Sequence, residues 1–171
     1  MIVTEAEIIS FTRELVPRYD YTDPNPLNAV RDGVGNCATR AYIVASSLKH
    51  IGEQPSFFIS AIHGKKDGMN RREQDMHEKL DEHGILEGMA MGHTVVLSEE
   101  RGLYFEFKAD AKTITPVRFK DSQRTFKNGL HIPEPNAAIA TYCNGHDFSF
   151  TSPEDIVLAR TLLNSHLESA F

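Results

Sequence analysis

The 171-residue sequence has only two cysteines, no tryptophan and no long apolar run, and each shortage excludes something. No 18 consecutive residues are apolar, so we expect no segment to span a membrane. The first ten residues include acids and lack the basic-then-apolar pattern of a secretory signal. With only two cysteines, this predicts a reducing, cytoplasmic compartment in which Cys37 and Cys143 remain free thiols.

Positive charge is also in short supply. Lysine and arginine number 18 against 24 aspartates and glutamates, a net charge of −6, so neither nucleic acid nor a membrane is an expected partner. The glycine-rich stretch 32–36 lacks the lysine of a phosphate-binding loop, and Cys143 with His146 has no second ligand pair for zinc. We therefore expect no metal and no cofactor. Composition leaves the oligomeric state open.

The patterns that are present predict a single α+β domain over residues 1–171. Thr4 and Glu7 form a capping-box pattern for a helix that ends before Pro17. Apolar residues three or four apart predict a helix with one apolar face at 38–49, and Ser152-Pro153 begins a last helix that runs to about residue 167. The predicted strands, most of them antiparallel, are 55–63, 93–99, 103–110, 112–119, 136–143 and 146–152.

A charged insertion at residues 64–88 separates the first two predicted strands. It is dense in both signs of charge and poor in bulky apolar residues, and residues 70–83 within it fit an exposed helix. Two interpretations stay open: a lid that selects substrate, or a solvated surface excursion with no role.

Cys37 is the first candidate for chemistry, because it follows a glycine-rich turn and begins a predicted helix. The helix N-terminus favours thiolate over thiol, and its free N–H groups can stabilise an oxyanion. Gly33 and Gly35 leave room for a substrate to approach the backbone. The alternative is that Cys37 is a small buried hydrophobe that fills a gap between helix and sheet.

His93 and Glu106 are the candidate partners of a Cys37 nucleophile, which needs a base held by a third group. His93 follows a glycine and opens an apolar strand, so it differs from the other seven histidines, most of which lie in charged or loop contexts. Glu106 lies inside the apolar run 103–107 of the next predicted strand. In a hairpin, that strand brings Glu106 near His93.

The stretch from residue 28 to 110 resembles the transglutaminase-like superfamily. The similarity rests on "GNC" at a helix start, a glycine after that helix, then a strand, and "GHTVVLSEERGLYFEFKAD" with the histidine at a strand start. Thr94 and Val95 depart from the small and aromatic residues that the family prefers after its histidine. The family's usual acid is aspartate, and its spacing falls on Lys108. Glu106 and Asp110 both have the matching strand parity; Glu106 is favoured because it lies within the strand.

The resemblance implies a papain-like α+β core, in which a Cys-bearing helix packs on an antiparallel sheet carrying His and acid. It implies a cysteine hydrolase or acyltransferase that attacks an amide or thioester carbonyl, in the manner of peptidases, amidases, deamidases and cross-linking enzymes. The catalytic set would be Cys37, His93 and Glu106, and the partner a protein, peptide or small amide substrate. A catalytically silent domain that binds a protein or peptide is the main alternative, and a purely structural domain is the third.

Overall fold

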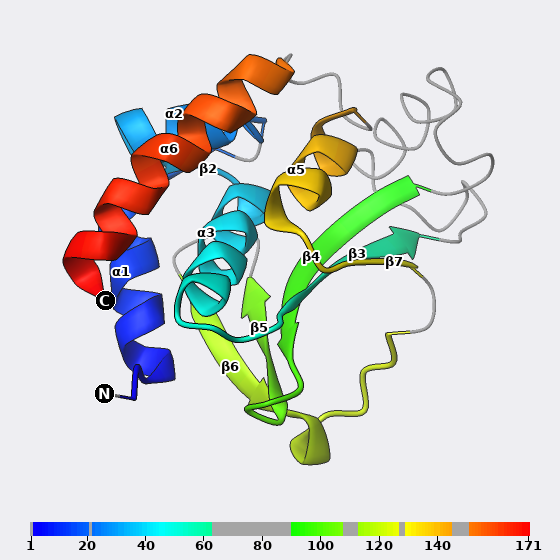
Figure 1. The fold of residues 1–171 in the computed structure, drawn as a ribbon. Helices are drawn as coiled ribbons and strands as arrows, with labels where there is room; N and C mark the ends of the chain where they lie inside the picture. Colours follow the sequence, from blue (N-terminus) through cyan, green and yellow to red (C-terminus); the bar gives the residue numbers. More distant parts are fainter. Residues whose placement is uncertain (1, 21, 63–89, 108–112, 127–128, 145–150) are drawn as a thin grey trace.

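A computed structural model describes residues 2–20, 22–62, 90–107, 113–126, 129–144 and 151–171 (Figure 1). The insertion predicted at 64–88 lies outside these residues. Asp110 and residues 146–150 of the strand predicted at 146–152 do so too. Within the described parts of the chain, no helix is long and apolar enough to cross a membrane.

A five-stranded antiparallel sheet forms one layer of the fold. Its strands are β3 (Ser56–Ile62), β4 (Ala90–Ser98), β5 (Leu103–Phe107), β6 (Ile114–Arg118) and β7 (Gly129–Ile132), in the order β6-β5-β4-β3-β7. A small parallel pair is made by β1 (Arg18–Tyr19) and β2 (Val34–Gly35). The helices are α1 (Glu5–Leu15), α2 (Pro26–Asp32), α3 (Cys37–His50), α5 (Pro135–Asn144) and α6 (Pro153–Ala170), with a short 3-10 turn η2 (Phe119–Asp121). The predicted α+β class is confirmed.

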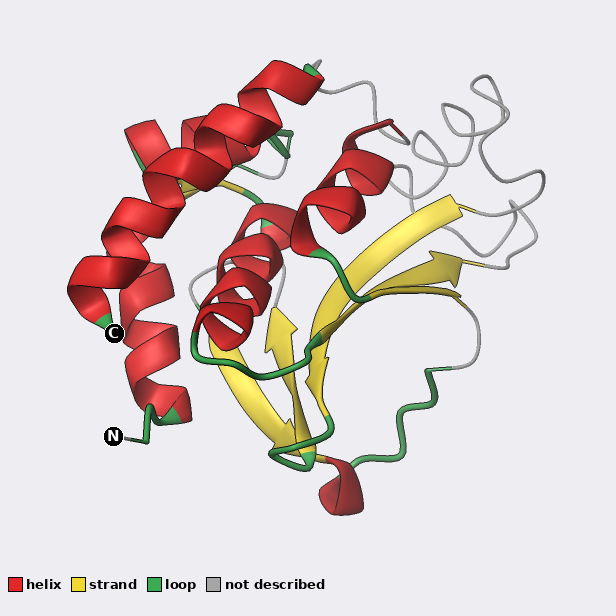
Figure 2. Ribbon diagram, viewed as in Figure 1, coloured by secondary structure: helices red, strands yellow, loops and turns green. Residues whose placement is uncertain are grey.

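Helix α3 is the centre of the molecule, between the sheet and the other helices (Figure 2). Every residue from Ala38 to Leu48 is buried, although the sequence predicted one apolar face. The polar members of this run have partners: Tyr42 donates to Asn136 Oδ1 at 3.0 Å, and Arg160 donates to Ser46 at 3.1 Å. A helix buried on all sides holds its first residue in a fixed place.

Two of the predicted helix starts are confirmed in detail. The Thr4 side chain accepts the N–H of Glu7, and the Glu7 carboxylate accepts the N–H of Thr4 at 2.7 Å. The Ser152 side chain caps α6 by accepting the N–H of Asp155, with Pro153 in the first turn. These signals are local, so they are readable without the tertiary structure.

The strand predicted at 136–143 is wrong, because this segment is the helix α5. Its buried residues are Ala138, Ile139, Tyr142 and Cys143, which repeat with the period of a helix. Pro135 stands at the first helical position, and the run contains three alanines, the best helix former. A short apolar run fits a strand or a helix, and the strand prediction overlooked these helix signals. The edge strand β7 was not predicted.

The face of the sheet turned away from α3 carries its own apolar cluster, built on four buried side chains. A segment that follows β6 packs over this cluster (Figure 2). The Phe126 ring meets the rings of Phe58 and Tyr104 edge-on, at centroid distances of 5.4 and 5.1 Å. The cluster comprises Phe58, Val95, Leu97 and Tyr104, with Val117, Phe119 and Phe126 packed against it.

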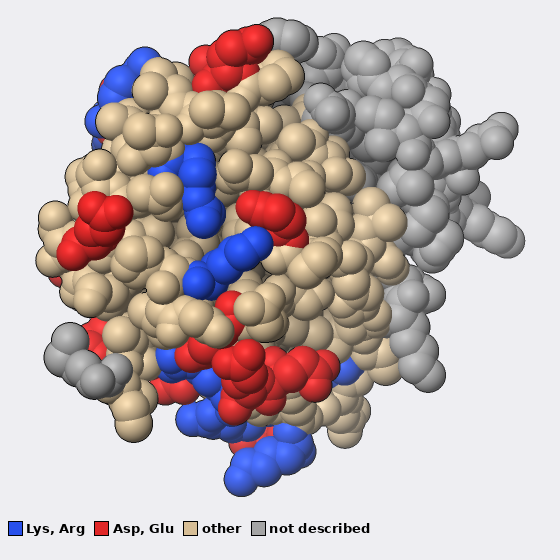
Figure 3. Space-filling model, in the orientation of Figure 1, with Lys and Arg blue, Asp and Glu red and all other residues tan. Residues whose placement is uncertain are grey.

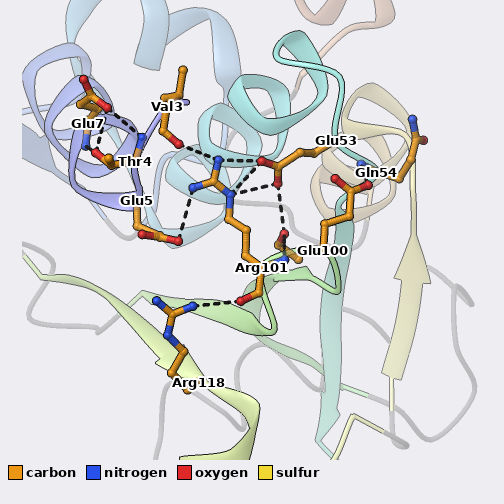
Figure 4. Close-up of polar contacts among 10 residues, drawn as sticks. Val3, Thr4, Glu5, Glu7, Glu53, Gln54, Glu100, Arg101 and Arg118 are labelled. Carbon is orange, nitrogen blue, oxygen red and sulfur yellow. Dashed lines mark hydrogen bonds and ion pairs between the residues drawn. The ribbon is translucent and has the colours of Figure 1, made fainter. Parts of the chain in front are cut away.

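Arg101, in the turn between β4 and β5, ties three parts of the chain together (Figure 4). Its guanidinium donates to Glu53 at 2.6 and 2.8 Å and to the Val3 carbonyl at 2.8 Å, and it pairs with Glu5 at 3.4 Å. The Arg101 and Glu53 side chains are only 12% and 17% exposed. The Arg101 carbonyl in turn accepts from Arg118 at 2.9 Å. The network therefore fixes the hairpin turn against α1 and the end of α3.

We expect Arg101→Met to lower the free energy of unfolding by about 2–3 kcal/mol, because the Glu53 carboxylate loses its partner in a partly buried place. Arg31→Met is the matched control, since Arg31 pairs with Asp32 at 2.9 Å but is 55% exposed. That change should cost much less, because solvent screens an exposed ion pair. Urea unfolding of the two variants measures both values. Equal losses would show that the Arg101 network stabilises no more than a surface pair.

The face of the molecule in Figure 3 carries both signs of charge. Most of its described surface is neither basic nor acidic, with separate patches of each sign, and side chains of both signs gather toward its lower end. Among the described residues, this face therefore shows no broad positive surface of the kind that binds a nucleic-acid backbone.

Candidate active site

Cys37 is the first residue of α3, as predicted, and the cap of that helix is Asn36. The Asn36 side-chain oxygen accepts the N–H groups of Ala38 and Thr39 at 2.9 and 3.2 Å. Two of the first-turn amides that the sequence offered to an oxyanion are therefore used by the cap. The Cys37 N–H is not one of these two, and it stands beside the sulfur.

The two glycines before Cys37 have structural reasons, which differ from the predicted one. Gly33 ends α2 in the left-handed region, at φ 70°, where a side chain is disfavoured. At Gly35 a Cβ atom would overlap Thr39 Oγ1. The close approach that requires glycine here is therefore to the chain's own helix rather than to a substrate.

His93 and Glu106 meet, as the hairpin argument predicted. The register of β4 with β5 sets Val95 opposite Glu106, so the acid lies diagonally across from His93 on the same face. His93 Nε2 contacts Glu106 Oε1 directly. The two side chains are 31% and 14% exposed. Of the two candidate acids, Glu106 holds the imidazole, whereas Asp110 lies outside the described residues.

Cys37 lies close enough to His93 for each side chain to shift the pKa of the other. Burial by itself raises the pKa of Cys37. The nearby His93 and Thr94 together lower it by a larger amount, so the net pKa lies below the usual 9.0. Burial lowers the pKa of His93, but Cys37 and Glu106 raise it to about 9. Both shifts favour a thiolate–imidazolium pair at neutral pH.

Two arginines lie close to this trio, and the sequence analysis named neither of them. Arg40, one helical turn after Cys37, is 3% exposed, donates to the Val16 carbonyl at 3.0 Å and lies over the Tyr19 ring. Cys37 raises the pKa of Arg40 electrostatically, against a larger lowering by burial, so the two residues interact. Arg124 Nη2 lies 3.0 Å from Glu106 Oε2.

Cys143 provides the internal contrast to Cys37. Both thiols are free, as predicted. Cys143 is 6% exposed, and its sulfur donates to the Pro24 carbonyl at 3.3 Å. Burial raises the pKa of Cys143 to about 12. The pKa of the thiol is thus lowered at Cys37 and raised at Cys143.

The arrangement supplies a thiol nucleophile, a base close to it and a carboxylate that contacts the base. These are the parts needed to transfer an acyl group through a thioester. Comparison of the chain with protein-family models, curated proteins and solved structures finds no match.

Proposed function

We propose that the protein is a cysteine-dependent hydrolase or acyltransferase acting on an amide or thioester carbonyl, built on a transglutaminase-like, papain-like core. The observation that supports this most is the position of His93, which contacts Glu106 through Nε2 and lies close enough to Cys37 to shift its pKa. The three residues come from three different elements, α3, β4 and β5. A cysteine placed only for packing requires neither partner.

In the proposed reaction, the Cys37 thiolate attacks the carbonyl carbon and a tetrahedral oxyanion forms. The Cys37 N–H is the amide we assign to that oxyanion. The C–N or C–S bond then breaks as the His93 imidazolium gives its proton to the leaving amine or thiol, which leaves an acyl group on the sulfur. Neutral His93 next takes a proton from water or an acceptor amine, which attacks the thioester and regenerates the thiolate. Glu106 orients the imidazole throughout.

A burst experiment with p-nitrophenyl acetate tests the proposal. We expect rapid release of nitrophenolate approaching one per protein molecule, then slower turnover as the thioester hydrolyses. Mass spectrometry should find the acetyl group on Cys37 and leave Cys143 unmodified. Slow release without a burst, or acetylation only on lysines, would favour the silent peptide-binding domain instead.

The pH dependence follows from the two shifted groups. Alkylation of Cys37 by iodoacetamide needs only the thiolate, so its rate should rise through a pKa below 9.0 and then hold. Hydrolysis of an amide also needs the imidazolium, so its rate should fall again as pH passes about 9, the pKa of His93. Glu106→Gln should move that alkaline fall to lower pH. Rate profiles between pH 4 and 10 check this; an amide profile without an alkaline fall would remove His93 as the acid.

A further inference from the structure

The Glu106 carboxylate lies between two cationic side chains, one on each oxygen. Oε1 contacts His93, and Oε2 pairs with Arg124 at 3.0 Å. Glu106 is 14% exposed, while Arg124 is 36% exposed, so the carboxylate is the more enclosed partner. A carboxylate held at one oxygen can rotate about its last bond, whereas one held at both oxygens has a fixed orientation.

Arg124 reaches Glu106 from a segment that is anchored on both sides. Ser122 Oγ shares a hydrogen bond with the Tyr104 hydroxyl at 2.9 Å and accepts the Arg124 N–H at 3.1 Å. On the other side, the Phe126 carbonyl is 2.6 Å from His131 Nε2, and the Phe126 ring packs on Tyr104. The Arg124 guanidinium itself lies 6.0 Å over the Tyr104 ring. The aromatic cluster on the outer face of the sheet thus sets where Arg124 stands.

The charges along this line alternate in sign. The thiolate of Cys37, the imidazolium of His93, the carboxylate of Glu106 and the guanidinium of Arg124 read minus, plus, minus, plus. Arg40, on α3, also interacts electrostatically with Cys37. Without Arg124, the remaining three groups would carry a net charge of −1, with the uncompensated negative charge on Glu106.

We propose that Arg124 is a positioning residue for the acyl transfer: it fixes the Glu106 carboxylate against His93 and neutralises the four-group line. The proposal rests on the proposed function of Cys37, His93 and Glu106. Arg124 touches no reacting atom and acts through Glu106 alone. The competing view is an ordinary exposed ion pair that contributes nothing to the chemistry.

Three single variants and one double variant test the proposal, with the rate of Cys37 alkylation by iodoacetamide measured from pH 4 to 10. Without Arg124, the Glu106 carboxylate is held at one oxygen only and stabilises the His93 imidazolium less, so Arg124→Gln should move the acid side of the profile up by about half a pH unit. Acylation by p-nitrophenyl acetate near neutral pH should slow by about 10-fold. Arg124→Lys should restore most of both. Lys120→Gln, the same charge change at an exposed residue of the same segment, should do nothing.

The double variant Glu106→Gln, Arg124→Gln separates action through Glu106 from a general effect of charge. If Arg124 acts through Glu106, the double variant should alkylate at nearly the same rate as Glu106→Gln alone. The proposal is overturned if the pH–rate profile of Arg124→Gln superimposes on that of the wild type. It is also overturned if Arg124→Gln changes the rate as much in the Glu106→Gln protein as in the wild type. A failure of the proposed function looks different: Glu106→Gln and His93→Gln would then also leave the wild-type profile unchanged.

Discussion

Replacing Cys37 with alanine is expected to abolish the nitrophenolate burst and to lower acyl transfer by about 10⁴-fold or more, since the proposed acyl intermediate forms on this sulfur. The fold should survive, because Cys37 is partly exposed at the start of α3 and its truncation opens little core volume. The expected loss of unfolding free energy is below about 1 kcal/mol. Burst kinetics and a thermal melt on the same sample measure both.

Cys143→Ala is the matched control for that variant. Cys143 is buried and its sulfur bonds the Pro24 carbonyl, so this change should cost about 1 kcal/mol or more while leaving the burst intact. The two variants should therefore differ. Cys37→Ala should lose activity and keep its stability, whereas Cys143→Ala should lose stability and keep its activity. A large drop in melting temperature for Cys37→Ala, with turnover retained, would make Cys37 a packing residue.

Replacing His93 with glutamine should have the second largest effect. Burial is the largest influence on Cys37 and raises its pKa, so the loss of the imidazolium should return the thiol to a pKa above its usual 9.0. Alkylation at pH 7 should slow by about 100-fold, and acyl transfer by about 10³-fold or more because the proton donor is also lost. Alkylation rates and burst kinetics check the two losses.

Glu106→Gln is the graded companion of His93→Gln. The amide keeps the volume and a hydrogen bond to His93 Nε2 but removes the negative charge, so its effect should fall between the wild type and His93→Gln. If both variants reacted like the wild type at every pH, the contacts between these side chains would have no part in activating Cys37.

Local signals explain why much of the fold was readable in the sequence. Thr4 and Glu7 define one helix start, and Ser152 with Pro153 defines another, through contacts within one helical turn. The segment 136–143 was predicted wrongly although Pro135 and three alanines favour a helix, because its short apolar run also fits a strand. Helix α3 likewise looked one-sided, because the partner of Ser46 is Arg160 on α6, far along the chain.

The residues of the candidate site also differ in how far the sequence predicted them. Cys37, His93 and Glu106 stand at the starts or inside of strongly patterned elements, so their meeting followed from a helix start and one hairpin register. Arg124 lies in an irregular segment without periodicity, and its contact with Glu106 depends on aromatic side chains folding over the outer face of the sheet. No pattern within the segment encodes that contact. Asking which cation could balance a strand carboxylate is the only cue that would have prompted a search for it.

The most direct test of the account is the rate at which iodoacetamide labels Cys37 and Cys143 in the same native protein at pH 7. The pKa of Cys37 lies below 9.0, whereas burial raises that of Cys143 to about 12. Peptide mass spectrometry over time should therefore find Cys37 labelled at least about 100-fold faster, with the difference collapsing in His93→Gln and in denaturant. Equal, slow labelling of both cysteines in the native protein would contradict an activated thiolate at Cys37, and with it the proposed chemistry.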